Sequence, residues 1–286
     1  AVSGDIEAIL KSIAELEDFQ VNHHSPLAGG SINQVFLLTT STGECVVKIN
    51  KSDDFPGMFI AEMEGLEVLQ GSNSFDIPKV FSFGETGGFS YLILEYKPEG
   101  AKHRDFADHF AQNLTALHKN TSPSFGFKNS NYIGSLPQTN GRENSASDFY
   151  IKQRLQPQFE LALENGYPFG NLSVFYKNIA SEIPDEQPAL IHGDLWGGNY
   201  LINQNGFPCL IDPAVSYAPR EMDFAMMKLF GGFPQRIFSA ADEINPLSPG
   251  FEKRIPLWQL YYLLVHLNIF GSSYHSRVSN NIRLYS

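Results

Sequence analysis

The 286-residue sequence has only two cysteines, Cys45 and Cys209, and fewer basic than acidic residues. Both cysteines lie in apolar, strand-like segments, so we interpret them as small buried side chains in a reducing compartment, not as a disulfide or metal site. The 20 Lys and Arg residues stand against 31 Asp and Glu residues, a net charge of −11. Binding to phosphates needs a basic face, so this balance argues against nucleic acid and against an anionic membrane as partners.

We expect neither a membrane-spanning helix nor a secretion signal. The most apolar stretch, residues 257–270, is interrupted by Gln259, His266 and Asn268, and it is shorter than the roughly 20 residues that cross a bilayer. The amino terminus has no charged segment followed by an apolar one. With 42% hydrophobic and 18% charged residues, the composition is that of a globular protein, and we predict a cytoplasmic location.

Three polar residues, Asp194, Asn199 and Asp212, stand at the ends of short apolar runs. The runs 189–191 and 200–202 bracket a loop that carries the first two residues, and a third run ends at Asp212. Short turns can bring such strand ends together. Phosphoryl transfer needs a carboxylate that accepts the proton of the attacking hydroxyl, and an amide and a second carboxylate that bind magnesium. A hairpin with a core histidine would explain residues 192–194 alone. It would not explain why Asp194, Asn199 and Asp212 have the order and spacing of the corresponding residues in kinases.

The N-terminal part of the sequence predicts one opening helix and a five-stranded antiparallel sheet with a second helix. Ile6, Leu10, Ile13 and Leu16 share one face of the opening helix, which we expect to end near Phe19. Strand-like runs follow up to residue 27 and over 35–40, 45–49, 79–84 and 89–95. The second helix follows the third run and buries an apolar face that includes Leu66.

This sheet has the features of a nucleotide site. Backbone N–H groups of a glycine-rich turn can bind phosphate oxygens. Lys48 lies inside an apolar strand, where its charge needs a partner, and we predict that Glu62 is that partner and that Lys48 contacts the α and β phosphates. A hairpin tip and a lysine at a sheet edge are the alternatives. The predicted phosphate loop comprises Gly29, Gly30, Ser31, Ile32 and Asn33.

Residues 97–100, with a proline and a glycine, predict a boundary between an N-terminal lobe (1–96) and a mainly helical C-terminal lobe (97–286). We expect adenine to meet backbone groups at Glu95, Tyr96 and Lys97. The helices are predicted over 103–119, 148–165 with a kink at Pro157, 172–183, 221–230 and 251–270. The polar stretch 120–147 is predicted to be a functional or mobile loop.

With these parts assembled, the chain resembles the aminoglycoside and choline kinase-like superfamily, and within it the fructosamine kinase (ketoamine kinase) family, over almost its whole length. The segments that carry the resemblance are 190–199 (LIHGDLWGGN), 211–214 (IDPA), 220–223 (REMD), 58–62 (MFIAE), 133–136 (IGSL) and 154–158 (RLQPQ). The resemblance implies an α+β, bilobal protein kinase-like fold and ATP-dependent phosphorylation of the 3-hydroxyl of a ketoamine, such as a fructosamine or ribulosamine, as a deglycation repair.

Residue roles follow from the same resemblance. Asp194 would be the base, and Asn199 and Asp212 the ligands of Mg²⁺. Trp196 would pack on the sugar, with a core tryptophan as the alternative, and Gln156 is the other predicted substrate residue. Asp223 and Glu221 would brace the catalytic loop without taking part in the chemistry. The family often has a cysteine where this chain has Ser31, so we expect no thiol-based control there.

Other readings stay open at this point. A kinase of the same fold could act on choline, homoserine or an aminoglycoside. A nucleotide-binding regulator without catalysis would usually lack at least one of the five groups that the reaction requires, which are Lys48, Glu62, Asp194, Asn199 and Asp212. A structural protein would have all five only by coincidence. We predict a monomer or a weak homodimer.

Overall fold

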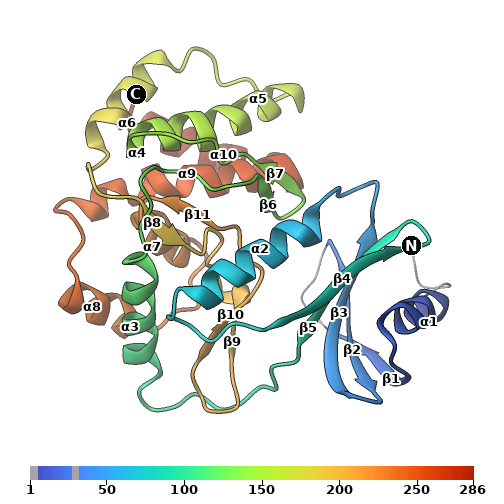
Figure 1. Cartoon of the computed structure of the whole chain (residues 1–286). Coiled ribbons are helices and arrows are strands. Elements are labelled where there is room, and N and C mark those ends of the chain that lie inside the picture. The colour runs from blue at the N-terminus through green and yellow to red at the C-terminus, as the bar shows by residue number, and fades with distance from the viewer. Residues whose placement is uncertain (1–5, 28–31) are drawn as a thin grey trace.

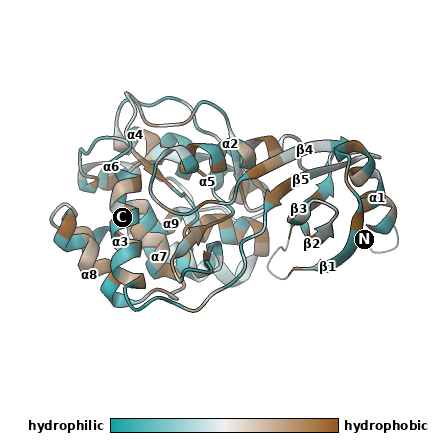
Figure 2. Ribbon diagram, turned by 60° about the horizontal axis from the view of Figure 1, so that its bottom comes forward, coloured by the Kyte–Doolittle hydropathy of each residue, from teal (hydrophilic) through white to brown (hydrophobic). Residues whose placement is uncertain are grey.

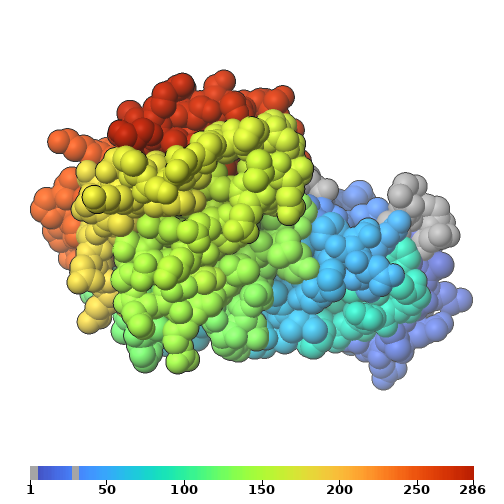
Figure 3. All heavy atoms as spheres, turned by 90° about the horizontal axis from the view of Figure 1, so that it is seen from above, coloured from blue at the N-terminus to red at the C-terminus, as the bar shows by residue number. Residues whose placement is uncertain are grey.

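The computed structural model of the chain describes residues 6–27 and 32–286 (Figure 1). A five-stranded antiparallel sheet forms the N-terminal part, and most helices lie in the C-terminal part, so the predicted α+β fold is confirmed. Seen from above, the blue N-terminal part and the green to red C-terminal part lie side by side (Figure 3). Within the described residues, no helix is both long and apolar enough to cross a membrane. The cytoplasmic location stays a prediction.

The sheet has the strand order β1-β2-β3-β5-β4, and every neighbouring pair is antiparallel. Its two faces have different partners. Val47 and its neighbours at every second position pack against Ile13 of helix α1 (Ile6–Glu17), whereas Val46 and Lys48 line the opposite face. Figure 2 shows hydrophobic residues along β4 and β5. The strands are β1 (Val21–Pro26), β2 (Gln34–Thr40), β3 (Gly43–Lys51), β4 (Val80–Thr86) and β5 (Phe89–Glu95).

Helix α2 (Met58–Gly71) lies between the sheet and the C-terminal part (Figure 1). Its buried residues, among them Leu66 and Leu69, belong to the large hydrophobic core that continues through the C-terminal helices. A side chain on Gly65 would place its Cβ 3.3 Å from Cγ of Pro213. The missing side chain thus lets α2 approach the segment that follows Asp212. The predicted lobe boundary after residue 96 stays a prediction.

The C-terminal part is built around α9, which is buried along most of its length. Three two-stranded sheets hold the loops that face the sheet of the N-terminal part. The helices are α3 (Phe106–His118), α4 (Ala146–Asp148), α5 (Gln156–Glu164), α6 (Ser173–Glu182), α7 (Glu221–Leu229), α8 (Gln235–Ile244), α9 (Phe251–Phe270) and α10 (His275–Arg283). The short strands are β6 (Asn131–Ile133), β7 (Leu136–Gln138), β8 (Ala189–Ile191), β9 (Tyr200–Ile202), β10 (Pro208–Leu210) and β11 (Ser216–Ala218).

The predicted helix over 251–270 is confirmed at both ends, and the other predicted helices are confirmed with shifts at their termini. Two helices, α8 and α10, were not predicted. A π-helical segment, Phe149–Leu155, precedes Pro157, which lies in the first turn of α5. The kink at Pro157 stays a prediction. The stretch predicted to be a loop over 120–147 contains the β6–β7 hairpin.

Candidate active site

A cavity of about 600 Å³ lies between the sheet, α2 and the C-terminal part. It is lined by predicted site residues from both parts of the chain: Ile32, Asn33, Lys48, Glu62, Glu95, Tyr96, Lys97, Asp194, Trp196, Asn199 and Asp212. Gln156, at the start of α5, does not line it. Gly29, Gly30 and Ser31 lie outside the described residues.

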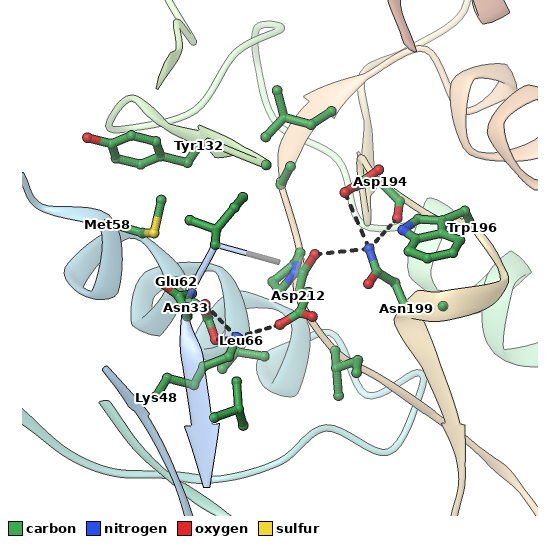
Figure 4. A pocket seen from close by; sticks show the side chains of 18 of the residues that line it. Asn33, Lys48, Met58, Glu62, Leu66, Tyr132, Asp194, Trp196, Asn199 and Asp212 are labelled. Carbon is green, nitrogen blue, oxygen red and sulfur yellow. Dashed lines mark hydrogen bonds and ion pairs between the residues drawn. The ribbon is translucent and has the colours of Figure 1, made fainter. Parts of the chain in front are cut away.

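Lys48 joins the two sides of the cavity (Figure 4). Its Nζ donates hydrogen bonds to Oε1 and Oε2 of Glu62, at 2.9 and 2.8 Å, and to Oδ1 of Asp212. Burial alone would lower the pKa of Lys48, but the carboxylates of Asp212 and Glu62 outweigh it and raise that pKa. The lysine therefore stays charged and links α2 to residues 211–215, which we call the Asp212 segment.

The loop from Asp194 to Asn199 places a carboxylate and an amide side by side. Nδ2 of Asn199 donates to the backbone oxygen of Asp194 at 2.8 Å and to its Oδ2 at 3.3 Å. Because the nitrogen is used in these bonds, Oδ1 of Asn199 is the atom that could bind a cation. Burial, together with the charge of Asp212, raises the pKa of Asp194 well above its ordinary value, which favours uptake of a proton by this carboxylate.

Asp223 of α7 fixes this loop from behind. Its Oδ2 accepts hydrogen bonds from the His192 N–H at 3.0 Å and from Nε2 of His118 at 2.8 Å, and its Oδ1 accepts from the Gly193 N–H at 3.0 Å. The predicted bracing role of Asp223 is confirmed. The same prediction is wrong for Glu221, whose carboxylate binds Arg254 and Nε1 of Trp258 and so fastens α7 to α9.

His192 connects the loop to the segment before Asp212. Its Nε2 donates to the Ile211 carbonyl at 2.7 Å, and its Nδ1 accepts from the Asp194 N–H at 3.1 Å. Burial lowers the pKa of His192, so the imidazole is held neutral. Gly193 has a φ of 89°, and a Cβ there would lie 1.9 Å from the Ala214 oxygen, so another residue would displace one of the two segments.

Trp196 lies at the open edge of the cavity and is 41% exposed, so it is not a core tryptophan. A Cβ on Gly198 would lie 2.2 Å from the Trp196 ring, so the glycine is needed for the ring to lie over the loop. Sequence reasoning missed His266 of α9, which also lines the cavity and donates from Nδ1 to the Tyr262 carbonyl at 2.7 Å. A polar residue inside a very apolar helix was the signal that could have identified it.

The predicted hinge is held by charged side chains. Nζ of Lys97 lies 2.9 Å from Oδ1 of Asp76 and 3.2 Å from Oε1 of Glu95, and Asp76 also accepts a hydrogen bond from Asn203. Within the described part of the chain, the backbone N–H and C=O groups of Tyr96 and Lys97 make no hydrogen bonds. They are therefore available to a flat heterocycle such as adenine.

The residues fit magnesium better than a metal held by protein alone. In residues 6–27 and 32–286, no three His, Cys, Asp or Glu side chains are grouped to hold a metal ion. The site offers one carboxylate, Asp212, and one amide oxygen, on Asn199. Mg²⁺ suits such a small set of oxygen ligands because it takes its other ligands from phosphates and water.

Comparisons with known proteins agree with this geometry. The family described as fructosamine kinase matches residues 5–285. The chain is 39% identical to a "Probable ketoamine kinase" of Enterococcus faecium, with 92% of this chain and 95% of that one covered. A crystal structure of a "Putative fructosamine-3-kinase" from Haemophilus somnus superposes with a TM-score of 0.87 at 28% identity, over 96% and 95% of the two chains. An aminoglycoside phosphotransferase, 18% identical, superposes with a TM-score of 0.62 over 98% and 99% and shows the shared fold alone.

Proposed function

The chain belongs to the fructosamine kinase family, and on this basis we propose that it uses ATP and magnesium to phosphorylate the 3-hydroxyl of a ketoamine. It is a phosphotransferase of the fructosamine kinase type. Fructosamines and ribulosamines are the proposed acceptors, and the proposed role is deglycation repair, because the phosphorylated adduct would be less stable than the ketoamine.

One observation carries the proposal: Lys48, Glu62, Asp194, Asn199 and Asp212 come from distant parts of the sequence and line one cavity. A regulator without catalysis would not need the complete set. Lys48 would bind the α and β phosphates, with Glu62 holding its ammonium group in place. The phosphate loop of residues 29–33 and the hinge residues 95–97 stay predicted nucleotide contacts.

Asp194 would accept the proton of the acceptor hydroxyl while the hydroxyl oxygen forms a bond to the γ-phosphorus and the bond to ADP breaks. Its raised pKa suits a base that must take up this proton. Asn199 and Asp212 would hold the magnesium ion, which supplies positive charge against the phosphates. Asp212 also contacts Lys48, and this ion pair holds the side of the cavity that would bind the nucleotide next to the side that carries the base.

Trp196 and His266, which both line the cavity, are the proposed contacts of the acceptor. The exposed indole face can pack against the apolar face of a sugar, and the neutral His266 can exchange hydrogen bonds with hydroxyl groups. Gln156 stays a prediction. Since it does not line the cavity, any effect of it on the substrate would be indirect.

The test is ATP consumption with magnesium against a ribulosamine, a fructosamine, choline, homoserine and an aminoglycoside. We expect turnover of a ketoamine, and a loss of about 100- to 10,000-fold in the Asp194→Asn protein, because an amide cannot accept the proton. Near-normal turnover in that variant would contradict the base assignment. Turnover of another acceptor in place of the ketoamines would contradict the substrate assignment and leave the kinase chemistry standing.

A further inference from the structure

A buried polar network lies against the Asp212 segment, and one of its members, Asn131, also lines the cavity. Each of its side chains is buried, and none was assigned a role by the chemistry above. Its members are Asn131 and Gln138 of the β6–β7 hairpin, Asn140 just after it, Arg154 of the π-helical segment and Tyr261 of α9.

The network touches the Asp212 segment at two carbonyl groups. Nδ2 of Asn131 donates to the Val215 oxygen at 2.8 Å, and Nε2 of Gln138 lies 3.3 Å from the Ala214 oxygen. Asp212 itself has a φ of 49°, a left-handed conformation that costs energy in a residue other than glycine and that contacts with its surroundings can stabilise. The two donors thus fix the backbone two and three residues beyond the proposed magnesium ligand.

The direction of these hydrogen bonds is set by Arg154. A guanidinium group can only donate, so Asn140 must turn its Oδ1 toward Nη2 of Arg154, at 2.7 Å. Nδ2 of Asn140 then faces Oδ1 of Asn131 at 3.0 Å, which in turn points Nδ2 of Asn131 at the Val215 carbonyl. Each amide orientation follows from the one before it.

The second branch runs through Gln138. Oδ1 of Asn131 and the Ala214 oxygen can only accept, so Gln138 turns Nε2 toward them and leaves Oε1 to accept from the Tyr261 hydroxyl at 2.7 Å. Both branches therefore end with N–H groups aimed at the Asp212 segment.

Arg154 has an unusual environment for a buried cation. It is 1% exposed, and within the described residues its hydrogen-bond acceptors are all neutral: the carbonyls of Thr139 and Gln153 and the amide of Asn140. Its guanidinium also lies over the Phe149 ring, 4.6 Å from the centroid. A buried charge without a carboxylate is costly. The charge of Arg154 polarises the amide groups of the network, so that their N–H groups point toward the Asp212 segment. An ion pair, which has no net charge, would not have this effect.

We propose that Asn131 and Gln138 are positioning residues for Asp212, that Arg154 imposes the amide orientations that this requires, and that Tyr261 supplies the donor for Oε1 of Gln138. The inference rests on the proposed function, because it takes Asp212 as a magnesium ligand. Partners that orient a metal ligand typically change metal affinity by about 10- to 100-fold when they are altered.

The sharpest variant is Asn140→Asp, which keeps the size of the side chain and gives Arg154 a carboxylate partner. It removes the Nδ2 donor, so an oxygen then faces Oδ1 of Asn131 and reverses the direction of the first branch. We expect the half-saturating Mg²⁺ concentration to rise about tenfold and the KM for the ketoamine to stay unchanged. The thermal stabilisation by Mg²⁺ with the non-hydrolysable analogue AMP-PNP should fall, a readout that does not depend on turnover.

A second variant, Tyr261→Phe, removes only the hydroxyl that donates to Oε1 of Gln138 and should shift the magnesium dependence in the same direction. Tyr285→Phe is its control, because that hydroxyl binds the Lys253 carbonyl, away from the network. Wild-type magnesium dependence and AMP-PNP stabilisation in both Asn140→Asp and Tyr261→Phe would overturn the proposal. An equal shift in Tyr285→Phe would overturn it too, since the effect would then reflect general loss of stability. A wild-type protein that gains no thermal stability from Mg²⁺ and AMP-PNP would instead contradict the proposed function.

Discussion

On the sheet side of the cavity the polar groups are held by charge, whereas on the helical side they are held by backbone hydrogen bonds. Lys48 meets two carboxylates, and one of them, Asp212, comes from the opposite side. Asp194 instead lies in a loop that Asp223 and His192 fix through main-chain groups. The ion pairs can rearrange when a nucleotide and a cation arrive, because phosphates can replace a carboxylate on Lys48. The loop cannot rearrange in this way.

This difference suits the proposed task of each side, since the helical side holds the base and the sheet side binds the phosphates. A base must be in place before the reaction, since preorganised groups need no reorganisation at the moment of reaction. The phosphate side must accept a highly charged ligand that carries its own cation. Each of the following variants is chosen to break one side of the cavity while the other stays intact.

Of the variants that leave the proposed base in place, Lys48→Met is expected to have the largest effect on turnover. Removal of one preorganised electrostatic partner of a transition state costs about 100- to 1,000-fold in rate, and we expect a loss in this range at saturating ATP. Stability should also fall, because Glu62 is left buried without its partner. Lys51→Met, an exposed lysine on the same strand, is the control and should keep its activity. An unchanged rate for Lys48→Met would show that another cation binds the phosphates.

Asp223→Asn tests the helical side. With one carboxylate oxygen replaced by an amide nitrogen, at least one of the buried N–H groups of His192, Gly193 and His118 loses its acceptor. An unsatisfied buried donor costs about 1–3 kcal/mol, and the loop that carries Asp194 should become mobile, so both unfolding free energy and turnover should fall. Denaturant unfolding and initial rates measure the two effects.

Glu221→Gln is the matched control for this variant, since it alters another buried carboxylate of α7. Its partners are Arg254 and Trp258, so it should lower stability without changing turnover measured well below the melting temperature. If Asp223→Asn lost stability alone, as the control does, the loop would not depend on Asp223 for its active conformation.

A smaller effect is expected from pH. Burial lowers the pKa of His192 in the folded protein below its usual value near 6.5, so the unfolded chain binds this proton more readily. The stabilising contribution of neutral His192 is complete above about pH 6.5 and is lost as the pH falls through the folded-state value. His192→Gln keeps a donor for the Ile211 carbonyl but cannot titrate. We expect its melting temperature to fall less steeply than that of the wild type between pH 7 and pH 5.

The exposed His103 gives the control for this comparison, because His103→Gln should retain the wild-type slope. Parallel curves for wild type and His192→Gln would mean that protonation of His192 is not linked to unfolding. Lys48 should not contribute to this slope, since its pKa is raised and lies far from this pH range.

The residues of the cavity could be predicted because chemistry and spacing identify them: Asp194, Asn199 and Asp212 end short strands, and Lys48 is a charge in an apolar strand. The five-stranded sheet and the C-terminal helices followed from strand and helix periodicity, and the protein kinase-like fold followed from the resemblance to the family. Helices α8 and α10 were missed because they contain few apolar residues, although those few lie on one face of each helix and do form a helical pattern. In α8 the buried residues are Ile237, Ala240 and Ala241, and in α10 they are Val278 and Ile282.

The polar network was invisible in the sequence for a different physical reason. Asn131, Gln138 and Asn140 are buried because they satisfy one another, and such residues look like those of a solvated loop. The partner of Glu221 was equally hidden, since only the packing of α7 on α9 brings Arg254 to it. Side chains whose burial depends on a distant partner leave no local pattern.

The smallest expected effect concerns the contact where the two sides touch, between α2 and Pro213. Alanine is a better helix former than glycine by about 1 kcal/mol, so Gly71→Ala, which meets nothing within 4 Å, should stabilise the protein by up to that amount. Gly65→Ala should gain less or nothing, because its Cβ would lie 3.3 Å from Pro213 and push on the Asp212 segment. Melting temperatures of the two variants measure the difference. An equal gain in both would show that the Asp212 segment yields to α2 at no cost, and that the two sides of the cavity adjust independently.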